Sequence, residues 1–290
     1  MPKGLYRTRA ADPTRQGLIF TIEAGDDILL TEEKDIMPKK AAKIAPDSAA
    51  SVPLSAKQAP IRPAHAPETA PAPARPNNTA HWVAKAREAA LAANTLDELK
   101  AALASFEGLD VRKTATNMVF SDGNPKARVM VIGEAPGADE DAQGLPFVGL
   151  SGRLLDKILL SIGLSRKSED VKNALYISNV LNWRPPGNRT PTPQEMEIAR
   201  PFIEKHVALV QPEILLFAGA VAVATLLPGA PTLSKVRGRW IDFQPQTEGI
   251  TLKKKVECYA LYHPAYLLRS PLQKKKAWHD MLTVAHKLGA

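Results

Sequence analysis

The sequence of 290 residues is poor in cysteine, in long apolar runs and in nucleotide-binding glycine patterns. Cys258 is the single cysteine, so one chain can build neither a disulfide framework nor a metal site of several thiolates. No run of 18 apolar residues occurs, and the N-terminus is polar with scattered charges. We therefore expect a soluble protein of the cytoplasm, with neither a membrane span nor a signal peptide.

The glycine-rich turn 133–137 lacks the companions that a nucleotide-binding turn needs. No Gly-x-Gly-x-x-Gly pattern occurs, and no Walker lysine follows the turn. These absences argue against a flavodoxin-like nucleotide binder, a reading that a bound flavin absorbance would revive. A net charge of +8 instead favours an anionic partner such as nucleic acid.

Composition divides the chain into three parts. Residues 1–43 contain only two short apolar runs and predict a weakly structured basic arm, with a partner-docking segment as the alternative. Residues 44–79 are rich in proline and alanine, which predicts a disordered linker. The remaining stretch, 80–290, has the hydrophobic patterning of one folded domain.

Within that domain, strand and helix patterns alternate. Apolar runs at 129–132, 174–181, 213–218 and 256–262 predict strands, and 111–120 predicts a further strand or extended segment. Helical spacing follows each of the four main runs, and capping boxes begin at Thr95 and Thr192. The order predicts an α/β fold, a three-layer α/β/α sandwich around a four-stranded parallel sheet.

Polar residues stand where three of these strands end. Glu134 follows the first strand, Asn179 lies in the second, and His263 follows the fourth. The carboxyl ends of parallel strands share one edge of the sheet, which is where such folds bind ligands. Each residue alone could be a turn former or a hydrogen-bonded strand end, but three together predict a site. The carboxamide of Asn179 suits base recognition because it can both donate and accept.

Other residues could contact a planar ligand or phosphates. Phe147 could stack on a ring or could simply pack in the core. The candidate phosphate contacts, which could also be ordinary surface residues, are Arg184, Arg189, Ser234, Lys235, Arg237, Gly238 and Arg239.

Four blocks carry a resemblance to the uracil-DNA glycosylase superfamily, nearest to its family 4. They read GEAPGADEDAQGLPFVGLSG, YISNVLNWRPPGNRTPTPQE, SKVRGRW and HPAYLLR, in the family's order and spacing. The resemblance covers most of residues 117–285. It implies a four-stranded parallel sheet between helices and an enzyme that hydrolyses the N-glycosidic bond of uracil in DNA.

The resemblance also implies a role for individual residues. Glu134 matches the carboxylate thought to position or activate water, and Glu140 matches a second carboxylate nearby. Ala135, Phe147, Asn179 and His263 match the uracil-binding positions, where Phe147 stacks on the base and His263 contacts its O2 atom. Tyr266 to Arg269, including Leu267 and Leu268, resembles the loop that enters the minor groove.

One departure concerns the family's iron–sulfur cluster, which four cysteines hold. The matching positions here read Phe106, Leu109, Trp183 and Ala199, and iron–sulfur clusters need thiolate ligands. We therefore expect no cluster, no other metal and no cofactor, with packing in the cluster's place. We expect a monomeric bacterial enzyme that works on uracil-containing DNA in the cytoplasm or nucleoid. The alternative is a catalytically silent module that binds uracil or a damaged base.

Overall fold

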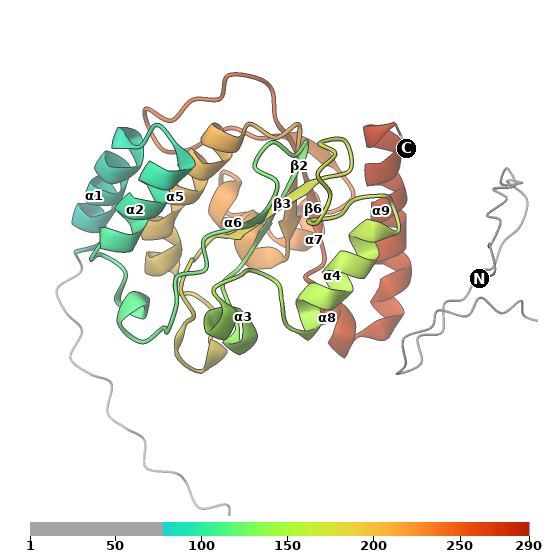
Figure 1. Ribbon diagram of the computed structural model, residues 1–290, viewed down its shortest axis with the longest axis horizontal. Coiled ribbons are helices and arrows are strands. Elements are labelled where there is room, and N and C mark those ends of the chain that lie inside the picture. Colours follow the sequence, from blue (N-terminus) through green and yellow to red (C-terminus); the bar gives the residue numbers. More distant parts are fainter. Residues whose placement is uncertain (1–77, 290) are drawn as a thin grey trace, which may run out of the picture. The chain divides into compact units, whose positions relative to one another are not determined.

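The computed structural model describes residues 78–289, and a six-stranded mixed sheet runs through this part of the chain (Figure 1). The four inner strands are parallel, and a short antiparallel strand closes each edge. In spatial order the strands are β1 (Asp122–Gly123), β3 (Leu175–Asn179), β2 (Val129–Gly133), β4 (Ile214–Ala218), β6 (Glu257–Leu261) and β5 (Trp240–Asp242).

Helices cover both faces of the sheet, as the alternating pattern predicts. One face is covered by α5 (Pro193–Val210) and α6 (Ala220–Leu226), and α1 (Thr79–Ala92) and α2 (Leu96–Ser105) pack against α5 in the same core. The other packs against α4 (Leu150–Leu160) and α9 (Lys274–Leu288). Side chains alternate between the two cores, with Met130 and Ile132 in the first and Val129 and Val131 in the second. The α/β sandwich is therefore confirmed.

Short elements connect these layers. They are η1 (Asp110–Lys113), α3 (Ala138–Gln143), η2 (Pro186–Asn188), α7 (Leu233–Val236), α8 (Pro264–Arg269) and η3 (Pro271–Gln273). Thr192 caps α5 as its sequence predicts: its side chain accepts from the amide of Glu195, whose carboxylate accepts from the amide of Thr192. No helix within 78–289 is long and apolar enough to cross a membrane.

The predicted extended segment 111–120 is wrong as a strand. Its first part is the 3₁₀ helix η1, and the buried residues Val119 and Phe120 bond outside any strand ladder. The Phe120 carbonyl accepts from the Ser178 hydroxyl at 2.7 Å, and the Val119 carbonyl accepts from the Asn182 amide at 2.9 Å. Side chains that lie about 60 positions later therefore take the bonds that a neighbouring strand would have supplied.

Two further differences concern the number of strands and the start of the last helix. The sheet has six strands instead of four because β1 and β5, which are two and three residues long, were not expected. The sequence pattern predicts the last helix over residues 278–288, but the helix begins at Lys274, although a first turn of lysines opposes the helix dipole. The expected basic arm and most of the expected linker lie in residues 1–77, outside the described part of the chain.

Candidate active site

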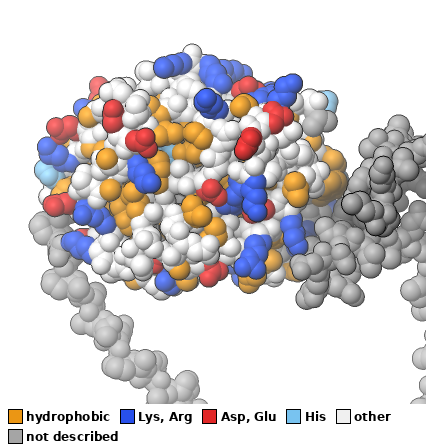
Figure 2. All heavy atoms as spheres, viewed as in Figure 1, with side chains coloured by type: hydrophobic (Ala, Val, Ile, Leu, Met, Phe, Trp, Pro, Cys, Tyr) orange, Lys and Arg blue, Asp and Glu red, His pale blue; other side chains and the backbone are white. Residues whose placement is uncertain are grey.

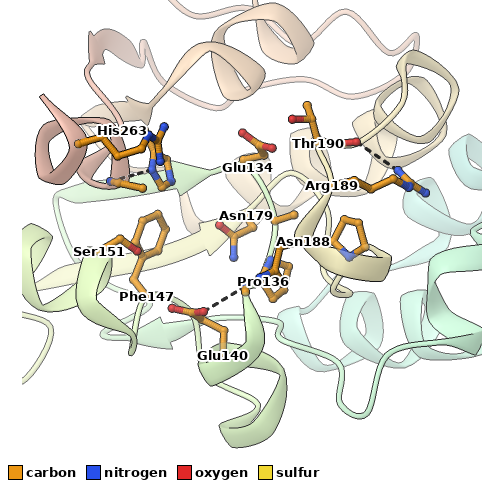
Figure 3. Close-up of a pocket in the computed structure, with 15 residues that line it drawn as sticks. Glu134, Pro136, Glu140, Phe147, Ser151, Asn179, Asn188, Arg189, Thr190 and His263 are labelled. Atoms are coloured by element: carbon orange, nitrogen blue, oxygen red, sulfur yellow. Dashed lines mark hydrogen bonds between the residues drawn. The ribbon is translucent and has the colours of Figure 1, made fainter. Parts of the chain in front are cut away.

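A cavity of about 500 Å³ opens at the carboxyl edge of the parallel strands (Figure 3). Strand register sets its position, because Gly133 at the end of β2 lies directly opposite Asn179 at the end of β3. Next to them, Ala218 of β4 pairs with Leu261 of β6, two residues before His263. The predicted residues that line the cavity are Glu134, Ala135, Glu140, Phe147, Asn179, Arg189, His263 and Arg269.

The absence of a side chain at Gly133 allows tight packing at the floor of the cavity. A Cβ atom at this position would lie 2.4 Å from Asn179 Oδ1 and 2.5 Å from the Phe147 ring. Both distances are far below a van der Waals contact, so any side chain at Gly133 would push the amide or the ring away. The glycine therefore keeps Asn179 and Phe147 side by side.

The Asn179 amide is buried yet available. The residue is 2% exposed, and no hydrogen bond to its carboxamide occurs among residues 78–289. Its side chain lines the cavity beside Phe147 and Glu134 (Figure 3). The carboxamide therefore faces the cavity with both its donor and its acceptor unused by the protein, which favours a polar ligand at this point.

Phe147 both lines the cavity and packs in the core. Its ring belongs to the second hydrophobic core, and the residue is 5% exposed. The ring also lines the cavity and lies 5.7 Å from the His263 ring, centroid to centroid, at 31°. The stacking and packing alternatives from the sequence are therefore compatible with each other.

His263 is held in one tautomer at the start of α8. Its Nδ1 atom accepts from the amide of Ala265 at 3.2 Å, which leaves the proton of a neutral ring on Nε2. Burial, and then the charge of Arg269, lowers the pKa of His263 to about 4. Gly219 permits the tight packing behind the ring, since a Cβ there would lie 2.9 Å from the Cβ of His263. At neutral pH His263 is thus an uncharged hydrogen-bond donor.

The two carboxylates of the first motif differ in their surroundings. Glu134 is half-buried, burial raises its pKa, and within 78–289 its carboxylate has no hydrogen-bond partner. Glu140 is buried, and its oxygens accept from the amides of Gly137, Val148 and Gly149, each at 3.0 Å. These bonds give Glu140 a structural function, because they join the turn at Gly137 to the turn at Val148 and Gly149. The catalytic roles of both carboxylates stay predictions, and of the two only the Glu134 carboxylate has no hydrogen-bond partner within 78–289.

The predicted minor-groove loop folds as the helix α8. Leu267 is 1% exposed and packs inward, whereas Leu268 is 43% exposed and Arg269 is also exposed. In this conformation only Leu268 of the two leucines can reach a nucleic acid. The sequence could not predict which of the two adjacent leucines is buried, because a segment of six residues is too short to show helical periodicity.

The predicted phosphate contacts also separate into exposed and engaged groups. Ser234, Lys235, Gly238 and Arg239 are exposed around α7. Arg237 instead pairs with the buried carboxylate of Asp280 at 2.8 Å and lies 4.4 Å from the centre of the Tyr262 ring. Arg237 therefore anchors this segment to α9. Figure 2 shows basic and acidic side chains interspersed on the viewed face.

The loop after β3 forms the opposite wall, which the sequence reasoning only partly anticipated. Arg189 lines the cavity while its guanidinium makes a two-pronged ion pair with Glu195, and Arg184 donates to Asn188 at 2.6 Å. Asn188 and Thr190 also line the cavity and were missed. The proline–glycine run 185–187, which fixes the loop's path, was the signal that could have found them.

The four residues expected at the family's cluster positions contribute packing. Phe106, Leu109, Trp183 and Ala199 are all buried in the first hydrophobic core. None carries a sulfur ligand, and Cys258 lies 1% exposed in β6, where burial raises the pKa of its thiol to about 12. These residues do not fit an iron–sulfur cluster, whose ligands are thiolates.

Comparison with known proteins agrees with the geometry. The family model described as the uracil DNA glycosylase superfamily matches residues 120–282. A Type-4 uracil-DNA glycosylase of Archaeoglobus fulgidus is 36% identical over 199 residues, 67% of this chain and 94% of the relative. One of Thermotoga maritima is 38% identical over 156 residues, 53% of this chain and 73% of the relative.

A more distant likeness extends to another type of the same enzyme. A Type-5 uracil-DNA glycosylase of Thermus thermophilus is 33% identical over 115 residues, 36% of this chain and 52% of the relative. The family match includes Glu134, Asn179 and His263, and it spans more than half of the sequence. The resemblance carried by the four sequence blocks is therefore confirmed, and the chain belongs to the uracil DNA glycosylase superfamily.

Proposed function

We propose that this protein removes uracil from DNA by hydrolysis of the N-glycosidic bond and leaves an abasic site. The observation that carries the proposal is the convergence of Glu134, Asn179 and His263 on one cavity beside the Phe147 ring. The activity of the Type-4 relatives supports it. DNA is the partner, the protein acts as a monomer in the cytoplasm, and no cofactor takes part.

The uracil nucleotide must leave the duplex before it can reach the cavity. Flipping a base out of the stack costs a few kcal/mol. Exposed basic residues, Arg269 at the cavity and Lys235 and Arg239 in and after α7, offset part of this cost through contacts with phosphates. The exposed side chain of Leu268 fills the vacated space in the stack.

Recognition of the base falls to Asn179 and Phe147. The Asn179 carboxamide accepts from uracil N3–H and donates to O4, and the Phe147 ring lies against the face of the base. Cytosine presents the opposite donor and acceptor pattern at both positions, which would leave buried polar atoms unpaired. Such mismatches reject a wrong ligand strongly.

Bond cleavage leaves positive charge on the sugar and negative charge on uracil O2. The Nε2–H of neutral His263 donates to O2, where the hydrogen bond strengthens as charge develops. The Glu134 carboxylate stabilises the cationic sugar and orients the attacking water. Water supplies the hydroxyl group that the sugar gains and the proton that the released base gains, so no other reactant is needed.

Replacement of His263 by alanine removes the donor to O2. We expect kcat to fall about 10²–10³-fold with a small change in KM, because the bond matters most in the transition state. Steady-state excision rates over a range of concentrations of a uracil-containing oligonucleotide measure both constants. The control is His286→Ala, an exposed histidine on α9, and equal rates for the two variants would remove His263 from the mechanism.

A methyl group at Gly133 tests the shape of the cavity floor. Gly133→Ala should lower kcat/KM for uracil excision by about 10²-fold, since a shift of about 1 Å at a site can have that effect. Gly163→Ala is the control: its φ of 81° makes an alanine there strained, but no atom lies within 4 Å of a Cβ at this position. The control should lose stability but no activity, and an active Gly133→Ala enzyme would contradict the packing argument.

Strand cleavage tests the proposed function itself. A labelled oligonucleotide with one uracil is incubated with the protein and then heated in alkali, which breaks the chain at abasic sites. We expect cleavage at the uracil and none in the same oligonucleotide with cytosine. Binding without cleavage would favour a uracil-binding module without catalytic activity, an alternative that no feature of residues 78–289 specifically supports.

A further inference from the structure

Arg166 lies behind the cavity wall and takes no part in lining it. The residue is in the loop between α4 and β3, and its side chain is 8% exposed. Its guanidinium donates to the carbonyl of Pro146 at 2.7 Å and to the carbonyl of Phe147 at 3.0 Å. Arg166 therefore binds the backbone on which the stacking ring is mounted.

Two carboxylates hold the guanidinium in place from the other side. Its Nε donates to Asp156 of α4 at 2.9 Å, and its Nη1 donates to Asp122 of β1 at 3.0 Å. Nearly all the donors of one side chain are thus committed to four groups on three segments of chain. The arrangement ties the Phe147 turn to the sheet edge and to the helix that follows the turn.

The turn that Arg166 binds is one that needs support. Phe147 has a φ of 54°, a left-handed conformation that side-chain-bearing residues rarely adopt and that persists only when the surroundings impose it. The carbonyl of Phe147 is confined on a second side by Gly152, where a Cβ would lie 1.9 Å from that oxygen. The conformation places the ring in the cavity opposite His263.

We propose that Arg166 is a positioning residue for uracil: it holds Phe147 in its left-handed conformation and so presents the ring as the surface on which the base stacks. The inference rests on the proposed function, since it concerns the same cavity. Arg166 contributes to the binding of the base and not to bond cleavage, because it touches neither the cavity nor the reacting atoms.

A lysine cannot replace Arg166 in this position. A single ammonium group has no planar fork with which to reach two carbonyls and two carboxylates at once. The Arg166→Lys variant keeps the charge and much of the length of the side chain, so it is the mildest change that removes the support. Arg153→Lys, an exposed position on α4, is the matched control.

The test measures KM and kcat for uracil excision together with the inhibition constant of free uracil. For Arg166→Lys we expect KM and the inhibition constant to rise about ten- to hundredfold, with kcat within about threefold of the unchanged enzyme. Neither binding constant depends on how much of the protein is folded, so partial unfolding alone would lower only the apparent kcat. A loss confined to kcat would overturn the inference, as would unchanged constants.

A double variant identifies the route through which Arg166 acts. If Arg166 works through the ring, Phe147→Leu together with Arg166→Lys should bind uracil no more weakly than Phe147→Leu alone. Additive losses would overturn the inference. An unchanged enzyme that released no uracil would overturn both proposals, whereas an active enzyme with an insensitive Arg166 would overturn this one alone.

Discussion

Glu134→Gln should bind uracil-containing DNA as well as the unchanged protein while its turnover falls about 10²–10⁴-fold, the usual contribution of a positioned general base. Glutamine has the same shape as glutamate but carries no charge and cannot take a proton from water. The Glu134 carboxylate has no protein partner within 78–289, so its removal should leave the surrounding packing intact. The loss should therefore appear in kcat, as for an interaction made chiefly in the transition state.

Dependence on pH gives the same test a second readout. Burial raises the pKa of Glu134 above its usual 4.5, so acid should inactivate the enzyme as protonation removes the carboxylate charge. His263, with a pKa lowered to about 4, is neutral well above that pH and should not limit activity near neutrality. The acid limb of kcat/KM should therefore be absent from the residual activity of Glu134→Gln.

Two other glutamates complete this experiment. Glu197→Gln, on the exposed side of α5, should leave turnover unchanged. Glu140→Gln should chiefly weaken the fold around the cavity, because the new amide cannot accept all three backbone bonds that the carboxylate accepts. Full turnover in Glu134→Gln, with the loss in a folded Glu140→Gln instead, would reverse the roles of the two carboxylates.

Asn179→Asp should weaken recognition of uracil and reduce the preference for uracil over cytosine. An ionised carboxylate accepts hydrogen bonds but donates none, so uracil O4 would face an acceptor in a site that is 2% exposed. A buried polar group without a partner costs about 1–3 kcal/mol, which corresponds to about a 5- to 150-fold loss for each mispaired atom. Excision rates on uracil and cytosine oligonucleotides give the ratio directly.

An exposed asparagine provides the comparison. Asn94 lies between α1 and α2, outside the cavity, so Asn94→Asp should change neither the rate on uracil nor the rate on cytosine. An unaltered preference in a folded Asn179→Asp protein would mean that another group reads the base. The buried carboxylate could also lower stability, so thermal unfolding of both variants should accompany the rates.

Local patterns in the sequence were sufficient for the parallel part of the fold. Four apolar runs predicted β2, β3, β4 and β6 because these strands are buried on both faces and carry apolar residues continuously. The edge strands β1 and β5 escaped prediction because two or three residues show no periodicity. Residues 111–120 were misread because their partners, Ser178 and Asn182, lie far along the chain.

For the candidate site, the sequence predicted which chemical groups meet but not how each is held. Glu134, Asn179 and His263 could be brought together because strand ends share an edge. The three backbone bonds of Glu140 and the inward direction of Leu267 depend on packing that no local pattern encodes. Arg166 was missed for the same reason, since its four partners come from distant segments.

The most direct measurement is the chromatographic detection of free base after the protein is incubated with a duplex oligonucleotide that carries one uracil. Our account predicts one equivalent of uracil per strand from this substrate and no free base when cytosine or thymine occupies the same position. Release of no base, or release of all three at similar rates, would contradict the claim that this cavity selects and excises uracil.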